Sequence, residues 1–576
     1  MVSDFLPFRQ LDGSLKRFSH TITSSREYPG AEAMLYGAGI KSEEDMYNKP
    51  HVGVSPIWWE GNPCNNHLLE LAKVVKQGVE KEDMIAWQYS AIGVSDTIAM
   101  GNEGMRFSLQ SREIIADSIE TVTCAQWHDA NISIPGCDKN MPGTLMAMAR
   151  FNRPSIMIYG GTIKPGYSTS LESPILVSHC FELHGALNEG QTDRATLDEV
   201  IRHACPGSGA CGGQYTANTM ATAAEAMGMS LPGSSSIPAK SPAKMRECLS
   251  AGKYLKVLME KDIKPRDIMT RKAFENAIVM TMALGGSTNA CLHLVAIAHC
   301  AEVELSLDDF QTISNKVPYI ADLKPSGKYV MEDLYNIGGV PAVMKLLHAA
   351  GYLDGSIMTV TGKTLAENLK HAPSLPQDQV IIHPLDKPLK AQGHIRVLYG
   401  NVAPKGAVAK ITGKEGNSFT GVARVFDSEE DALRAINNHE IKEGQNTVLV
   451  IRYEGPKGGP GMPEMLKVSS MLMGTQLGKC TAIITDGRYS GASHGFIIGH
   501  ICPEAQEGGP IAVINNGDSI TIDAVNNTIN VHLPDHELTT RLQNWTAPPL
   551  KVKRGTLAKY AALVSDASHG CVTDLF

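Results

Sequence analysis

The order of the secondary-structure patterns along the chain is what most constrains its fold. Between residues 50 and 369, short apolar runs such as HVGVSPIWW alternate with segments such as LLELAKVVKQGVE, whose apolar residues recur at helical spacing. A Pro-rich stretch at residues 372–388 ends this alternation, and strand-like runs follow it: HIRVLYG, AVAKITG, TGVARVF and TVLVIRY. The pattern therefore predicts an α/β domain followed by a β-rich domain.

We predict four segments from this change. They are an N-terminal arm (1–25), a large α/β domain (26–371), a linker (372–389) and a β-barrel-like domain (390–576). Closing a sheet of short strands into a barrel removes its exposed edges. In the last domain, the run IAVINNGDSITIDAVNNTINVHL is expected to form a meander of three strands divided at Asn-Gly and Asn-Asn, and a helix capped by Ser428 is expected near residue 430.

Composition narrows the classes of function. The formal net charge is −8, from 52 basic and 60 acidic side chains, and no basic cluster is present, so nucleic acid and membrane surfaces are not expected as partners. No segment approaches the roughly 20 unbroken apolar residues of a membrane span. Twelve cysteines without a secretory signal peptide indicate a reducing compartment, where thiols are available for metals.

The decapeptide IPGCDKNMPG places three kinds of metal chemistry on consecutive residues. Cys137 offers a soft thiolate, Asp138 a hard carboxylate and Lys139 an amine, between two Pro-Gly pairs that disfavour regular structure. Side chains of neighbouring residues in an extended turn point in opposite directions, so Cys137 and Asp138 can face two different metals. A helix is expected to begin at Pro142. Taken alone, this stretch fits a buried cysteine in an ordinary turn better.

Two more cysteines occupy equivalent positions. Cys64 in EGNPCNN and Cys211 in GSGACGGQ each precede a predicted helix, the first capped by Asn65 or Asn66. Helix N-termini that converge on one point would stabilise the negative charge of a thiolate-bound cluster. Other cysteines, such as those of ACLHLVAIAHC, lie within helical runs and are interpreted as core residues.

Three further loops carry candidate groups. Asp96, in VSDTIAMG, follows a predicted strand, and ligand groups of open α/β sheets collect at such strand ends. EGPKGGPGMPEML is expected to open a helix with Glu464 in its first turn, and it lacks the Gly-Lys-Ser/Thr ending of a phosphate-binding loop. In TDGRYSGASHG, Ser490 follows the strand CTAII, and a turn serine is the favoured alternative to a catalytic one. Arg488 and His494 can be a carboxylate clamp and a base, or salt-bridge and turn residues.

Seven motifs occur in a fixed order: GNPCNNHLLE, VSDTIAMG, IPGCDKNMPG, GACGGQYTANTM, GGSTNACLHL, YEGPKGGPGMPEM and TDGRYSGASHGFIIGHICPEA. Together they resemble the dihydroxy-acid dehydratase and sugar-acid dehydratase family from about Arg26 to the C-terminus. Reasoning from the residues alone reaches only a metal-dependent α/β enzyme with a β-rich second domain.

The resemblance implies two cofactors. A 2Fe-2S cluster is expected on Cys64, Cys137 and Cys211. Another branch carries an oxygen-labile 4Fe-4S cluster and lacks a cysteine in the first motif, so Cys64 favours 2Fe-2S. A Mg²⁺ ion is expected beside the cluster, with Lys139 carbamylated so that its amine becomes an anionic oxygen ligand for a hard cation. The carboxylate ligands expected for magnesium are Asp96, Asp138 and Glu464.

The resemblance also implies a reaction. Magnesium would bind the carboxylate and C2 hydroxyl of a 2,3-dihydroxy acid, the open iron would accept the C3 hydroxyl, and Ser490 would remove the C2 proton, with its pKa lowered by the metal. Loss of water would leave an enol that tautomerises to the 2-keto acid. The phrases SLQSREIIADSIET, GGTIKPG and SHGFIIGH are closest to the fungal branched-chain type, so we expect 2,3-dihydroxy-3-methylbutanoate and its 3-methylpentanoate homologue as substrates, in valine and isoleucine biosynthesis.

Four positions depart from the family pattern: Cys124, Trp127, His128 and Ala492. They motivate the hypothesis of a duplicated copy with a reshaped substrate channel that tolerates an inhibitor. Two alternatives stay open, a pentonate or hexonate dehydratase and a catalytically inactive metal-binding paralogue, although retention of every expected ligand together with Ser490 speaks against the second. Cys124 is interpreted as a packed thiol.

The resemblance implies a homodimer whose active site lies near the domain junction and is completed at the subunit interface. The first thirty residues contain four basic side chains among several Ser and Thr, as in organellar transit segments, although Asp4, Asp12 and Glu27 depart from that composition. A mitochondrial location is predicted, with a cytoplasmic one as the alternative.

Overall fold

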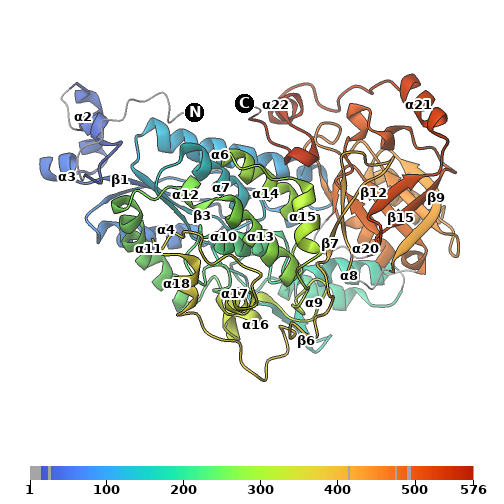
Figure 1. Ribbon diagram of the computed structural model, residues 1–576, viewed down its shortest axis with the longest axis horizontal. Helices are drawn as coiled ribbons and strands as arrows, with labels where there is room; N and C mark the ends of the chain where they lie inside the picture. Colours follow the sequence, from blue (N-terminus) through green and yellow to red (C-terminus); the bar gives the residue numbers. More distant parts are fainter. Residues whose placement is uncertain are drawn as a thin grey trace.

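A computed structural model describes residues 14–23, 27–188, 190–412, 416–473, 476–489 and 495–574. Ser490, Ala492 and His494 lie outside the described residues. Figure 1 shows two regions side by side, a helix-rich N-terminal region and a C-terminal region built around a curved sheet. None of the described helices combines the length and the apolar character that a membrane span requires.

The N-terminal region contains a four-stranded parallel sheet in the order β2-β1-β3-β4. Its strands are β1 (His51–Pro56), β2 (Ile85–Gln88), β3 (Ala130–Ile134) and β4 (Ser155–Met157). Every residue of β1, β3 and β4 is buried, as expected of parallel strands covered on both faces. All parallel strands end at the same edge of the sheet, and the loops at this edge carry the candidate site.

Helices surround this sheet (Figure 1). They are α1 (His20–Thr23), α2 (Pro29–Gly37), α3 (Glu43–Asn48), α4 (Leu68–Glu80), α5 (Asp96–Ala99), α6 (Arg106–Ala125), α7 (Asn140–Phe151), α8 (Val177–Asn188), α9 (Arg194–His203), α10 (Thr216–Met227), α11 (Pro242–Glu260), α12 (Pro265–Ile268), α13 (Arg271–Leu284), α14 (Asn289–Cys300), α15 (Leu307–Ser314), α16 (Met331–Asn336), α17 (Gly339–Ala349) and α18 (Leu365–Leu369). The small hairpin β5 (Gly166–Ser168) and β6 (Ser173–Ile175) precedes α8. All residues of α10 are buried, because its short side chains allow neighbouring helices to approach closely.

The C-terminal region is an eight-stranded, nearly closed sheet, which confirms the barrel-like prediction. Its order is β16-β15-β9-β10-β12-β14-β8-β7, and Tyr399 bridges the end of β7 to Thr528 of β16. The strands are β7 (Ile395–Leu398), β8 (Ala407–Lys410), β9 (Ser418–Phe426), β10 (Thr447–Ile451), β12 (Thr481–Thr485), β14 (Ile497–Gly499), β15 (Ser519–Asp523) and β16 (Thr528–Val531). Its helices are α19 (Glu429–Asn437), α20 (Lys467–Met473), α21 (Asp535–Asn544) and α22 (Thr556–Leu563).

Several local predictions are wrong for identifiable reasons. The late meander has two strands instead of three, because Pro510–Val513 forms a 3-10 turn in which the amide of Ala512 bonds to the carbonyl of Gly509. Helix α7 begins two residues before Pro142, since this third position still needs no N–H donor within the helix. The predicted cap Asn65 instead donates to Asn140 Oδ1 at 2.9 Å.

The segments predicted as arm and linker both pack on the N-terminal region where they are described. The amides of Phe18 and Ser19 donate to the Asp129 carboxylate at 2.6 and 3.0 Å. Ile382 is buried, and the next amide donates to the carbonyl of Ile320. The segment boundaries themselves stay a prediction.

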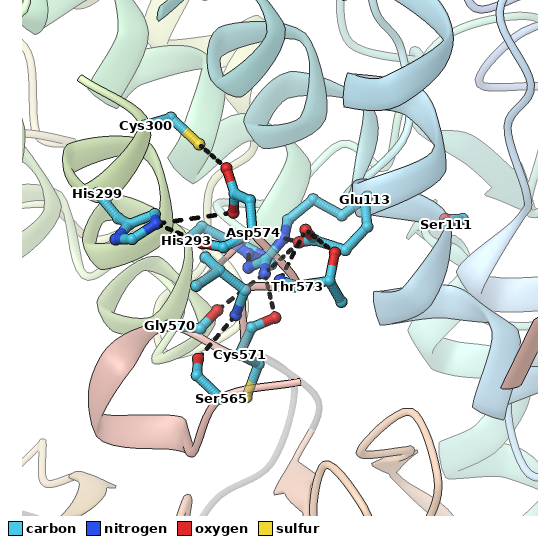
Figure 2. A network of polar contacts seen from close by, with 12 residues as sticks. Ser111, Glu113, His293, His299, Cys300, Ser565, Gly570, Cys571, Thr573 and Asp574 are labelled. Carbon is cyan, nitrogen blue, oxygen red and sulfur yellow. Dashed lines mark hydrogen bonds and ion pairs between the residues drawn. The ribbon is translucent and has the colours of Figure 1, made fainter. Parts of the chain in front are cut away.

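The C-terminal end of the chain also returns to the N-terminal region. Figure 2 shows residues after Ser565 lying against α6 and α14, where they form a network of polar contacts. The two regions therefore share an interface that includes the last described residues.

Replacing Gly136 by alanine tests the packing of two loops at the sheet edge. Gly136 follows β3, and a Cβ atom there would overlap the carbonyl oxygen of Cys64. We expect Gly136→Ala to lower the free energy of unfolding by about 1–3 kcal/mol, measured by urea unfolding of metal-free protein. Gly30→Ala is the matched control, because α2 leaves open space for a methyl group. Equal stability of the two variants would contradict this close packing.

Candidate metal centre

The predicted ligands meet at the carboxyl edge of the parallel sheet. Cys64 follows β1, Asp96 follows β2, and Cys137 to Lys139 follow β3. Cys211 lies in the loop before α10, and a single pocket is lined by all three cysteines and all three candidate carboxylates. The structure thus brings together groups that lie as far as 400 residues apart in the sequence.

The three thiols form one group. Cys64 is 9% and Cys137 is 4% exposed, and Cys211 is half-buried. Interactions with the thiols of Cys137 and Cys211, together with burial, raise the pKa of Cys64 well above its ordinary value. All three are free thiols. A cationic iron-sulfur cluster core would bind the thiolates and so offset the rise in the pKa of Cys64. The three sulfur donors therefore fit such a cluster.

Two buried asparagines, Asn140 and Asn218, hold the loops that carry the thiols. Neither asparagine was among the predicted site residues. The Asn140 side-chain oxygen accepts from the amide of Cys137 at 2.7 Å and from Asn65 at 2.9 Å, which ties the Cys137 loop to the Cys64 loop. Asn218 donates to the carbonyl oxygen of Cys211 at 2.5 Å. Asn140 lies three residues after Cys137, and Asn218 lies seven residues after Cys211. This spacing is the sequence signal from which their roles could have been predicted.

The carboxylates form a second group beside the thiols. One oxygen from each of Asp96, Asp138 and Glu464 lies within 4.8 Å of the others. Burial, followed by the nearby charge of Asp96, raises the pKa of Asp138 to about 7. Asp96 Oδ1 is buried without a hydrogen-bond partner among the described residues. Buried hard oxygen donors with an unused lone pair fit a divalent cation such as Mg²⁺.

Lys139 lies between these carboxylates. Its amine contacts Asp96 and lies 3.5 Å from Glu464 Oε2 and 4.0 Å from Asp138 Oδ2. The side chain is 1% exposed. Although burial acts to lower the pKa of Lys139, the neighbouring carboxylates raise it overall. The ammonium group therefore supplies the positive charge that this cluster of acids requires when no metal is bound.

Glu464 comes from the C-terminal region and corrects a prediction. It belongs to a two-residue strand, β11 (Glu464–Met465), which pairs in parallel with β13 (Arg488–Tyr489), so the predicted helix is absent at this point. The Glu464 carboxylate accepts from Arg488 at 3.1 Å and from Asn289 at 3.0 Å. Arg488 is completely buried and takes the salt-bridge role. The role of Asn289 was not predicted.

The pocket also has an apolar side. Met100, Val177, Phe181 and Leu466 line it together with the charged groups. Val177 and Phe181 belong to α8, which packs against α20 of the C-terminal region. The pocket therefore lies at the junction of the two regions, as predicted for the active site.

Three unusual residues lie away from this pocket. Cys124, at the end of α6, packs against the N-terminal core, which agrees with a packed thiol. Trp127 and His128 precede the amino end of β3, whereas the site follows its carboxyl end. These positions therefore give no support to a reshaped substrate channel. The fourth, Ala492, lies outside the described residues.

Comparisons with known proteins identify the family to which the chain is similar. The N-terminal domain of dihydroxy-acid/6-phosphogluconate dehydratases matches residues 49–368, and the C-terminal domain matches residues 380–571. The chain is 60% identical to the mitochondrial dihydroxy-acid dehydratase of Schizosaccharomyces pombe, with 98% of this chain and 94% of that protein covered. It is 57% identical to the mitochondrial enzyme of that name from Saccharomyces cerevisiae, over 97% and 96% of the two chains.

A bacterial relative shows the same similarity. The dihydroxy-acid dehydratase of Francisella tularensis subsp. novicida is 59% identical, over 97% of this chain and 99% of that protein. Both halves of the chain are matched, and so is 94–99% of the length of these relatives. The chain therefore belongs to the dihydroxy-acid/6-phosphogluconate dehydratase family.

Proposed function

We propose that this protein is a dihydroxy-acid dehydratase, a hydro-lyase that converts 2,3-dihydroxy-3-methylbutanoate and its 3-methylpentanoate homologue into the 2-keto acid and water, in valine and isoleucine biosynthesis. The observation that carries this proposal is the single pocket that three thiols and three carboxylates line together. Relatives that match nearly the full length carry the name dihydroxy-acid dehydratase, which favours this substrate class over sugar acids.

We propose that Cys64, Cys137 and Cys211 hold a 2Fe-2S cluster, because the three thiols line one pocket and those of Cys137 and Cys211 act on the pKa of Cys64. Asp96, Asp138 and Glu464 would hold Mg²⁺. When bound, the two centres supply Lewis-acid charge beside the carboxylate and hydroxyl oxygens of the substrate. Reaction of the Lys139 amine with carbon dioxide would give a carbamate, whose oxygen replaces the ammonium charge with a hard anionic ligand.

The residues of the chain divide the remaining work. Ser490 is proposed as the base that removes the C2 proton, while hydroxide leaves C3 and the resulting enol tautomerises to the keto acid. Ser490 follows directly after β13, the strand that pairs with the Glu464 strand. Arg488 and Asn289 hold one Glu464 oxygen, so the other can face the substrate side.

The apolar side of the pocket supports a branched substrate. Methyl groups at C3 gain contact with side chains such as Val177 and Phe181. A sugar acid would place its additional hydroxyl groups against the same side chains, where they lose hydrogen bonds to water.

Location and assembly complete the proposal. The fungal relatives are named mitochondrial enzymes, and we propose the same compartment for this chain. We also propose a homodimer. Inhibitor tolerance and an inactive paralogue are retained only as hypotheses that kinetic assays decide.

The first experiment is an anaerobic assay of iron-reconstituted protein with magnesium. We expect 2-keto acid to form from 2,3-dihydroxy-3-methylbutanoate, with negligible product from arabonate, xylonate or gluconate. Preferential turnover of a sugar acid would replace the proposed substrate, and no turnover despite a complete cluster would support the inactive paralogue. Parallel inhibitor titration of a housekeeping relative would test the tolerance hypothesis.

Two substitutions distinguish the role of a magnesium ligand from the role of the catalytic base. Asp138→Asn removes a charged ligand, so we expect magnesium affinity to fall roughly 10- to 100-fold while the visible absorption of the cluster is retained. Ser490→Ala should retain both cofactors and lose turnover. Calorimetric titration with magnesium and absorption spectra measure the two properties. Wild-type magnesium affinity in Asp138→Asn, or full activity in Ser490→Ala, would remove that residue from its assigned role.

Truncating an apolar side chain that lines the pocket tests the preference for a branched substrate. Phe181→Ala removes contact with the branched end of the substrate, so kcat/KM for the branched acid should fall about 10- to 100-fold, corresponding to about 1–3 kcal/mol. Phe181→Leu keeps most of the apolar volume and serves as the matched control. An unchanged kcat/KM in Phe181→Ala would show that the branched end binds elsewhere.

A further inference from the structure

The C-terminal end of the chain forms a clasp on the N-terminal region. We define the C-terminal clasp as residues 570–574 together with their partners Arg112 and Glu113 on α6 (Figure 2). We propose that this clasp is a positioning element that aims the Glu464 carboxylate at the metal site. This inference rests on the proposed function, in which Glu464 is a magnesium ligand.

Arg112 anchors the clasp. Its Nη2 donates to the carbonyl oxygens of Gly570 and Cys571, each at 2.8 Å, and to Glu113 at 2.7 Å. The Arg112 side chain is completely buried. A buried guanidinium that binds main-chain carbonyls fixes the path of the backbone itself, and a replacement leaves several buried polar groups without partners.

Further contacts hold the last described residues. Glu113 Oε2 accepts from the amide and the hydroxyl of Thr573 at 3.3 and 3.1 Å. The Asp574 carboxylate lies 3.0 Å from Arg150 Nε, and His299 hydrogen-bonds to the Asp574 carbonyl at 2.7 Å. Figure 2 shows Glu113 of α6 and His299 of α14 pointing toward Thr573 and Asp574 of the tail. The tail is therefore held along its length rather than at one point.

One connection from the clasp to the metal site runs through Met462. Cys571 Sγ lies 3.7 Å from Met462 Sδ, and both belong to a small apolar cluster that also includes Leu109 of α6 and Leu292 of α14. Met462 has φ +47°, a left-handed conformation that a residue with a side chain rarely adopts. Packing in this cluster stabilises that conformation. The carbonyl oxygen of Met462, a residue only two positions before Glu464, accepts a hydrogen bond from Arg488 Nε at 2.8 Å.

A second connection runs along α14. Arg112 Nη1 lies 3.3 Å from His293 Nδ1, and Asn289, one turn earlier on the same face, donates to Glu464. The clasp thus fixes the backbone before Glu464 through Met462, and it orients the Glu464 carboxylate through Asn289.

The test compares divalent-cation affinity and local hydrogen exchange in the full-length chain. Arg112→Lys retains a positive charge beside Glu113 but loses the fork to the two tail carbonyls. Cys571→Ala removes the thiol that contacts Met462 in the apolar cluster, keeps the backbone carbonyls that Arg112 binds, and carries the test if Arg112→Lys does not fold. We expect Mn²⁺ affinity to fall roughly 10- to 100-fold in Arg112→Lys and in the same direction in Cys571→Ala. Amide exchange at residues 462–465 should accelerate in the metal-free protein.

Lys405→Gln is the matched control. It breaks a contact of the same tail, with Asp566 at 2.9 Å, but lies 54% exposed and outside the clasp, so affinity and exchange should match wild type. Wild-type Mn²⁺ affinity and wild-type exchange at 462–465 in folded Arg112→Lys and Cys571→Ala would overturn the inference. A wild-type protein that binds no Mn²⁺ would instead overturn the magnesium role of Glu464, and the exchange measurement would still decide whether the clasp orders this segment.

Discussion

Repulsion between the three carboxylates is the constraint on which the rest of the site depends. Oxygens of Asp96, Asp138 and Glu464 lie within 4.8 Å of one another in a buried pocket, where like charges repel by several kcal/mol for each pair. The fold holds them there with cations from two directions. Lys139 lies among them, and Arg488 binds Glu464 from behind. Since two cations do not balance three carboxylates, the arrangement favours a further positive charge in the pocket.

The site is assembled from elements that cannot form separately. The thiol loops and two carboxylates follow strands of the parallel sheet, whereas Glu464 arrives on β11 from the C-terminal region. The two-residue pairing of β11 with β13 has little stability alone, and buried Arg488 supplies the missing specificity by bonding to Glu464, Asn289 and the Met462 carbonyl. Folding of both regions therefore precedes completion of the metal site.

The sequence predicts the fold and the ligands well where local patterns are strong. The apolar run HVGVSPIWW identified β1, and the strand predicted before Asp96 corresponds to β2. The cysteines at loop-to-helix junctions line one pocket. Predictions failed where tertiary contacts decide the outcome. Glycine and proline before Glu464 are compatible with a helix start, but pairing with Arg488 makes this residue part of a strand. The supporting role of Asn289 depends on Glu464 and Arg488, which are distant in sequence, so no spacing rule reveals it. The catalytic role of Ser490 stays a prediction.

The positions of the candidate metal ligands depend on covalent geometry for Cys137 and Asp138, and on non-covalent packing for Glu464. Cys137 and Asp138 are adjacent in the chain, with Cα atoms about 3.8 Å apart, so the separation between thiol and carboxylate groups changes little when the two regions move. Glu464 has no such covalent link to the sheet edge, and its position depends on Arg488, Asn289 and the packing of Met462. Motion between the regions therefore alters the hard-metal site before it alters the thiol group, because only the former takes a ligand from both regions.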